Sequence, residues 1–221
     1  MKIAALIPIK GFANAKQRLS AQLSAGERAL LAETMMRDVV AEAVAAHGLD
    51  AVYVVTGNEH VAKIAGALDA RVILEEEESG ETGAVEFALA ELKRRGVDAA
   101  LVVPADMPLV RASDLEQVIG QAPSAAPFAL LVPSHDRMGT NALLLAPPDI
   151  IRLRFGYDSF SYHVSQVAAR GAPLTVIENE RISLDIDEPR DLERFVAAGG
   201  GPGATYARLM EMRAAARGTG A

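Results

Sequence analysis

The amino-acid sequence predicts an α/β domain built on a mostly parallel, twisted sheet with helices on both faces. Short, continuous apolar runs, of which 51–56 (AVYVVT) and 99–103 (AALVV) are the clearest, are typical of strands that are buried on both faces. Longer segments with apolar residues at helical spacing separate these runs, and this alternation indicates parallel strands joined by helical crossovers. Polar residues gather directly after the strands, which is the edge where open α/β sheets bind ligands.

Each element has its own local signal along the chain. The apolar run 3–9 is the first expected strand, and a helix follows over 24–48 because Leu31, Met35 and Val39 repeat at helical spacing and Gly48 stops the pattern. A later helical pattern ends at Gly96. The remaining strands are expected at 51–56, 71–74, 99–103, 128–132, 142–145 and 174–177, and the remaining helices at 60–68, 83–95, 115–119, 159–170 and 191–198.

The length and composition bound the classes of protein that are possible. At about 100–200 residues per domain, the 221 residues correspond to one domain, which we place at 1–198. A Gly-rich break (GGGPGA) and a tail follow over 199–221, where a short helix is expected as a surface segment or a contact in a homodimer.

Charge and cysteine content exclude several functions. The 22 Lys and Arg residues against 29 Asp and Glu give a net charge of −7, which argues against nucleic acid or an anionic membrane as the main partner. Without cysteine there is no disulfide framework, zinc-thiolate site or thiol nucleophile. Pro8 and Lys10 interrupt the apolar N-terminus, and no apolar run approaches the ~20 residues of a membrane span, so we expect a cytoplasmic protein.

A basic loop follows the first expected strand. It carries Lys10, Lys16 and Arg18 among Gly and small residues, which suits a phosphate cradle in which backbone N–H groups hold oxygens and the cations neutralise charge. The alternative is a solvated basic turn before a helix, since the loop has no Walker-type Gly-Lys-Ser/Thr sequence.

Three carboxylates also follow strand-like runs. Asp106 lies between Pro104 and Pro108, just past a buried strand, where it is suited to bind Mg²⁺. Asp185 and Asp187 are two residues apart, so in extended backbone their side chains share one face and reach one metal region. The alternatives are a turn-capping role for Asp106 and an N-cap role for Asp187 or Glu188 in the helix that follows.

Two small-polar loops are candidates for binding an anion. Thr140 in GTN and Gly156 and Ser159 in FGYDSF offer hydroxyl and backbone N–H donors that suit a phosphate or carboxylate. Ordinary turn chemistry is the alternative for both loops. His135 and His163 have no partner at metal-ligand spacing, and both are expected at the surface.

With these pieces in order, the chain resembles the phospholactate guanylyltransferase family of deazaflavin coenzyme F-420 biosynthesis, within the nucleotidyltransferases of the molybdenum-cofactor guanylyltransferase type. The resemblance runs over about 3–195 and rests on IPIKGFANAKQRLS, VVPADMPLV, GTNALLL, FGYDSF and LDIDEPRDL. Each motif alone is weak, and the five in this order are specific. The resemblance implies a fold like that of nucleotide-diphospho-sugar transferases.

The resemblance also implies an activity, the transfer of GMP from GTP to a phosphorylated three-carbon acid with release of pyrophosphate. The acid is 2-phospho-L-lactate, phosphoenolpyruvate or 3-phosphoglycerate, and Mg²⁺ is the implied cofactor. The family's site residues fall on the phosphate-contacting Lys10, Lys16 and Arg18, the metal-binding Asp106, Asp185 and Asp187, the acceptor-binding Thr140, Gly156 and Ser159, and the nucleotide-binding Gly80, Glu81, Thr82 and Pro104.

One turn departs from the family pattern. Gly80, Glu81 and Thr82 stand where the family usually has Gly-Leu-Asn, and a Glu81 carboxylate could accept hydrogen bonds from the guanine N1–H and amino group.

Two other functions remain open: a nucleotidyltransferase for a sugar phosphate or molybdopterin, and a nucleotide-binding module without catalysis.

Overall fold

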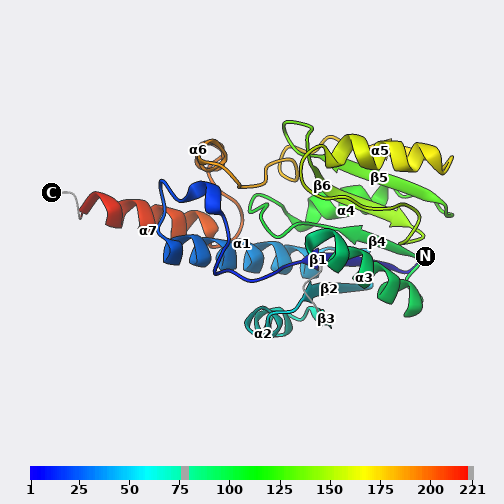
Figure 1. Cartoon of the computed structure of the whole chain (residues 1–221), viewed down its shortest axis with the longest axis horizontal. Coiled ribbons are helices and arrows are strands. Elements are labelled where there is room, and N and C mark those ends of the chain that lie inside the picture. Colours follow the sequence, from blue (N-terminus) through cyan, green and yellow to red (C-terminus); the bar gives the residue numbers. More distant parts are fainter. Residues whose placement is uncertain (76–79, 219–221) are drawn as a thin grey trace.

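The computed structural model describes residues 1–75 and 80–218, and within them a seven-stranded sheet is the centre of the fold (Figure 1). The strand order is β3-β2-β1-β4-β6-β5-β7. The strands are β1 (Ile3–Pro8), β2 (Ala51–Thr56), β3 (Arg71–Leu74), β4 (Ala99–Val102), β5 (Phe128–Pro133), β6 (Thr140–Ala146) and β7 (Leu174–Val176). The predicted α/β class and mostly parallel sheet are confirmed.

Strand directions decide which residues reach the functional edge of the sheet. β1 pairs in parallel with β2 on one side and with β4 on the other, so the chain switches sides next to β1. β6 runs antiparallel to both β4 and β5. Because of this reversal, the first residues of β6, Thr140 and Asn141, lie at the same edge as the carboxyl ends of β1 and β4.

Helices cover both faces of the sheet. The helices are α1 (Ala25–Ala45), α2 (Glu59–Ala67), α3 (Gly80–Arg94), α4 (Ala112–Gly120), α5 (Ser159–Ala169), α6 (Pro189–Ala197) and α7 (Thr205–Gly218), with a 3-10 turn, η1 (Gln17–Leu19). α1, α2 and α4 pack on the face that contains Ala5 and Val54, whereas α3 and α5 pack on the face that contains Leu6 and Val55. None of the described helices has the length and apolar character needed to cross a membrane.

Helix starts follow recognisable capping chemistry. Ser24 and Glu27 form a reciprocal capping box at the start of α1, with the Ser24 N–H donating to the Glu27 carboxylate at 2.8 Å. α6 has Pro189 at its first turn, and the Asp191 carboxylate accepts from the N–H of Glu188 at 2.8 Å. Asp191 therefore fixes the chain as it leaves the segment that carries Asp185 and Asp187.

The C-terminal segment packs against the domain rather than forming a loose surface tail. α7 lies alongside α1 (Figure 1), and Leu209 and Met212 are buried in an apolar cluster with Leu192 and Phe195 of α6. Gly201 approaches the Pro108 carbonyl so closely that any side chain there would collide with it. At Gly201, within the Gly-rich break of the sequence, glycine thus permits a close approach between two backbone segments.

Candidate active site

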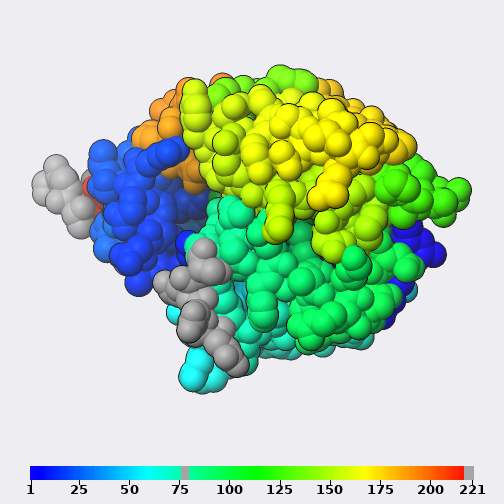
Figure 2. Space-filling view, turned by 45° about the vertical axis from the view of Figure 1, so that its right-hand side comes forward, coloured from blue at the N-terminus to red at the C-terminus, as the bar shows by residue number. Residues whose placement is uncertain are grey.

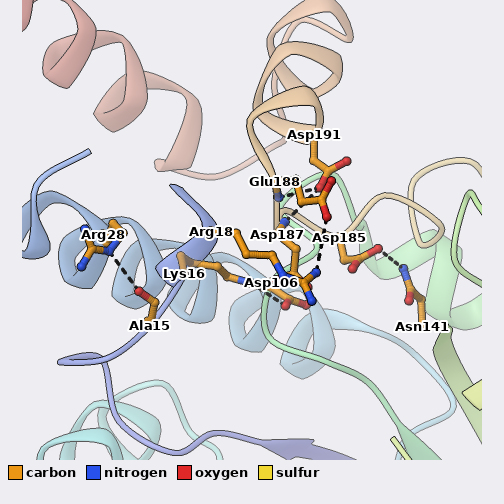
Figure 3. Close-up of polar contacts among 10 residues, drawn as sticks. All are labelled: Ala15, Lys16, Arg18, Arg28, Asp106, Asn141, Asp185, Asp187, Glu188 and Asp191. Carbon is orange, nitrogen blue, oxygen red and sulfur yellow. Dashed lines mark hydrogen bonds and ion pairs between the residues drawn. The ribbon is translucent and has the colours of Figure 1, made fainter. Parts of the chain in front are cut away.

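The loops after β1 and β4 meet at the topological switch point of the sheet. Lys16, from the loop after β1, extends toward Asp106, from the loop after β4, and its Nζ lies 2.6 Å from Asp106 Oδ2 and 2.9 Å from Asp187 Oδ1 (Figure 3). The structure thus brings together one predicted phosphate-contacting cation and two predicted metal ligands. Although burial opposes the charged form, the charges of Asp106 and Asp187 hold the pKa of Lys16 well above its usual range.

The basic loop is held in place by a buried arginine. Lys16 has a left-handed backbone conformation, with φ at 51°, and begins the short turn η1. The Arg28 guanidinium, from α1, donates to the Ala15 carbonyl at 3.4 Å (Figure 3). It also donates to the Leu23 carbonyl at 2.9 Å. These bonds fix both ends of the segment that presents Lys16 to the carboxylates.

Backbone hydrogen bonding places the carboxylate pair beside Asp106. The Ile186 N–H donates to the Asp106 carbonyl at 3.0 Å, so the segment 185–187 runs directly past the end of the β4 loop. Asp187 then reaches Lys16, while Asp185 Oδ1 accepts from Asn141 Nδ2 at 3.0 Å (Figure 3). Burial, together with the negative charges of Asp106 and Asp187, raises the pKa of Asp185 to about 6.

The three carboxylates are neighbours, but they do not converge on one point. Within residues 1–75 and 80–218, no group of three or more His, Cys, Asp or Glu side chains is close enough to hold a metal ion. Lys16 lies between Asp106 and Asp187 instead. Asp106 Oδ1 is nevertheless buried without a hydrogen-bond partner in the described part of the chain, and a buried carboxylate oxygen of this kind is a suitable ligand for a cation.

A cavity of about 590 Å³ opens beside this cluster. Its lining includes Lys10, Lys16, Glu81, Pro104 and Asp106, together with much of the loop after β1. Figure 2 shows a recess between the blue N-terminal segment and the green residues of α3. The cavity is therefore large enough for a nucleotide, and both cationic and anionic side chains line it.

Arg18 is placed differently from the two lysines. Its side chain is 70% exposed and its guanidinium lies 3.5 Å from Glu188 at the start of α6 (Figure 3). Arg18 is not among the residues that line the cavity. The phosphate contact predicted for Arg18 remains a prediction.

The turn that departs from the family pattern forms the first turn of α3. The helix begins at Gly80, three residues before the predicted start. Thr82 lies in its first turn, and Thr82 Oγ1 accepts from the Phe155 N–H at 3.1 Å. Glu81 is accessible from the cavity, and the surrounding protein and the charge of Asp106 raise its pKa above the ordinary value. Thr82 thus ties the predicted nucleotide turn to the predicted acceptor loop.

The predicted acceptor residues are close together. The Ser159 hydroxyl accepts from the Thr140 N–H at 3.1 Å, and the Ser159 N–H donates to the Gly156 carbonyl at 3.2 Å. Both hydroxyl side chains are buried, and neither residue lines the large cavity. Their binding role remains a prediction.

The sequence did not indicate the role of His163, which contacts both Thr140 and the loop before α5. His163 was expected at the surface, but it is fully buried, and its Nδ1 lies 2.9 Å from Thr140 Oγ1. The only sequence signal was its position four residues after Ser159 on one helix face. His135 is exposed, as expected.

Comparison with known families gives a match over nearly the whole chain. The model of the family described as "Guanylyl transferase CofC like" matches residues 3–217. A phosphoenolpyruvate guanylyltransferase of Conexibacter woesei is 32% identical over 95% of this chain and 95% of its own length. A 2-phospho-L-lactate guanylyltransferase of Methanothermobacter thermautotrophicus is 34% identical over 94% of this chain and 89% of its own.

A third relative is described as acting on another acid. It is a 3-phospho-D-glycerate guanylyltransferase of Phenylobacterium zucineum, 32% identical over 85% of this chain and 86% of its own length.

Among solved structures, a protein of Desulfovibrio desulfuricans described as a nucleotide-diphospho-sugar transferase superposes with a TM-score of 0.79, at 16% identity, over 97% of this chain and 96% of its own. This last likeness confirms the fold.

Proposed function

The chain belongs to the family of CofC-like guanylyl transferases, and from this we propose that it transfers GMP from GTP to a phosphorylated three-carbon acid and releases pyrophosphate. In this reaction an oxygen of the acceptor phosphate forms a bond to the α-phosphorus of GTP, and the bond from that phosphorus to pyrophosphate breaks. The proposed product serves the assembly of a deazaflavin coenzyme.

The observation that carries the proposal is the grouping of Lys16, Asp106 and Asp187 beside a cavity of about 590 Å³ at the switch point of the sheet. Transfer of a nucleotidyl group asks a protein mainly to position two anions and to neutralise charge, without a protein nucleophile. Lys10 and Lys16 line the cavity and supply positive charge next to the triphosphate. An acceptor phosphate is already ionised near neutral pH, so the site needs no general base.

We further propose that Asp106, Asp185 and Asp187 hold Mg²⁺ when the triphosphate is bound. The unpartnered Asp106 Oδ1 and the mutual repulsion of the three carboxylates support this assignment. Magnesium is usually held by one or two carboxylates together with phosphate oxygens and water, so three converging protein ligands are not required. The ion would neutralise charge on the triphosphate and the acceptor.

The loops around Thr140, Gly156 and Ser159 are the proposed site for the acid. They lie at the edge where β6 begins, and the Phe155–Thr82 hydrogen bond joins them to the start of α3, whose Glu81 lines the cavity. Relatives of similar identity are described as acting on phosphoenolpyruvate, 2-phospho-L-lactate and 3-phospho-D-glycerate. All three acids carry a carboxylate and a phosphate on three carbons, and all three are candidate acceptors.

Pyrophosphate release tests the proposal directly. The purified protein, with Mg²⁺ and GTP, is given each of the three acids in turn, with ATP in parallel. Release that requires GTP and one of the acids is expected, and Asp106→Asn should abolish it while Asp149→Asn, at a surface ion pair with Lys93, should not. Turnover with hexose 1-phosphates or a molybdopterin instead would move the protein to another acceptor class, and GTP binding without turnover would indicate a binding module.

A further inference from the structure

A buried histidine anchors the acceptor loops, although nothing in the sequence motifs singles it out. His163, in α5, has no exposed surface, and its ring meets the ring of Phe155 edge to face, with centroids 5.5 Å apart and an interplanar angle of 68°. Its two ring nitrogens each have one partner. Nδ1 lies 2.9 Å from Thr140 Oγ1, and Nε2 accepts from the Arg154 N–H at 3.2 Å.

These two contacts fix the tautomer of the ring. A backbone N–H can only donate, so Nε2 must be the unprotonated nitrogen and Nδ1 must carry the hydrogen. His163 therefore donates to Thr140 Oγ1. Burial and the nearby positive charge of Arg154 also lower the pKa of His163 to about 4, which keeps the ring neutral near physiological pH.

The fixed tautomer determines what the Thr140 hydroxyl can do. Its oxygen already accepts from His163, so its own hydrogen is free to donate, and in residues 1–75 and 80–218 it has no other hydrogen-bond partner. Ser159 is in the same state, because its oxygen accepts from the Thr140 N–H and its hydrogen has no acceptor in that part of the chain. Two adjacent hydroxyls are thus oriented as donors, which is the arrangement that an anionic oxygen requires.

We propose that His163 is a positioning residue for the acid substrate, which it serves by donating to Thr140 and so directing the Thr140 hydroxyl hydrogen toward a carboxylate or phosphate oxygen of the acid. This inference rests on the proposed function, because it takes the acid to bind at Thr140 and Ser159. His163 itself does not touch the substrate.

Two nearly isosteric variants separate this role from simple core packing. Asn places an amide at the position of Nδ1 and retains a donor to Thr140, whereas Gln places its amide at the position of Nε2 and retains only the contact with the Arg154 N–H. We expect His163→Gln to raise the KM for the acid about tenfold with an unchanged KM for GTP, and His163→Asn to restore the wild-type KM. Thermal unfolding of each variant confirms that it is folded.

A double-mutant cycle with Thr140→Val adds a readout that packing alone would not move. Once the hydroxyl is gone, His163→Gln should raise the KM for the acid no further, since each change alone removes the oriented hydrogen bond from the Thr140 hydroxyl to the acid. Equal KM values for the acid in the Asn and Gln variants, or fully additive effects in the cycle, would overturn the inference. If the wild-type protein releases no pyrophosphate with GTP and any of the acids, the proposed function itself fails, and that is seen before any variant is made.

Discussion

Lys16 Nζ lies 2.6 Å from Asp106 Oδ2, although 90 residues separate the two along the chain. The loops that carry them follow β1 and β4, which are neighbours in the sheet. The same ammonium contacts Asp187 at 2.9 Å, and the side chain of Lys16 is only 10% exposed. One cation therefore holds two carboxylates that would otherwise repel each other beside the cavity.

Replacing that cation should affect both turnover and stability. Lys16→Met leaves Asp106 and Asp187 facing each other and removes positive charge from the phosphate site, so we expect pyrophosphate release to fall about 100-fold or more in kcat/KM. The free energy of unfolding in urea should fall by about 1–3 kcal/mol, less than for a fully buried pair because the Asp187 side chain is 46% exposed.

Lys63→Met is the matched control for this change, because Lys63 is exposed on α2 and does not line the cavity. It should keep both the activity and the unfolding curve of the wild-type protein. Wild-type kcat/KM in Lys16→Met would refute the catalytic role assigned to Lys16.

Glu81 is the candidate for discrimination between guanine and adenine. A carboxylate in the cavity wall can accept from the guanine N1–H and amino group, whereas adenine presents an acceptor at N1. Glu81→Gln should therefore lower the ratio of kcat/KM for GTP to that for ATP by about tenfold. The exposed Glu59 gives the control variant Glu59→Gln, and an unchanged ratio in Glu81→Gln would remove Glu81 from base recognition.

The sequence predicted the sheet well because its strands are continuous apolar runs with clear ends. β2 coincides with the predicted run 51–56, and β4 ends one residue before the predicted limit. The start of α3 was less accurate, because Gly80 and Thr82 resemble turn residues in sequence. The Phe155–Thr82 contact that holds this turn joins residues 73 positions apart, and local signals do not report such contacts.

The candidate site was predictable only in part, for the same reason. Charge and position after strands were enough to select Lys16, Asp106 and Asp187, which the fold brings together. The placement of Lys16 between two carboxylates depends on side-chain reach across three loops. His163 was misjudged because a lone histidine at helical spacing has no pattern that distinguishes a buried anchor from a surface residue.

His163 should also make stability depend on pH. In the unfolded chain its pKa is near 6.5, whereas burial and Arg154 lower the folded pKa to about 4, so its neutral form is favoured by folding. This contribution is fully present above pH 6.5 and is lost as the pH falls toward 4. We expect the difference in free energy of unfolding between wild type and His163→Asn to shrink by roughly 3 kcal/mol over that range.

Taking the difference from a variant is necessary because Asp185 titrates in the same range with the opposite sign. Burial raises the pKa of Asp185 to about 6, so its contribution to stability grows as the pH falls through that value. Both proteins contain Asp185, and its effect cancels in the difference. A pH-independent difference for His163→Asn would refute the assignment.

The C-terminal helix should be needed for stability even though the sequence places it outside the domain. Truncation after Ala198 exposes the apolar surface that Leu209 and Met212 cover, so we expect a clearly lower Tm and a lower free energy of unfolding.

A milder test is Asp38→Ala, because the Asp38 carboxylate accepts from the Ala204 N–H at 2.9 Å and from the Thr205 N–H at 2.8 Å at the start of α7. Loss of these bonds should lower the free energy of unfolding in urea by about 1–2 kcal/mol. In the truncated chain Asp38→Ala should have no such effect, because Ala204 and Thr205 are absent. Equal stability of the truncated and full chains would instead mean that residues 199–221 form a separate segment that adds nothing to the core.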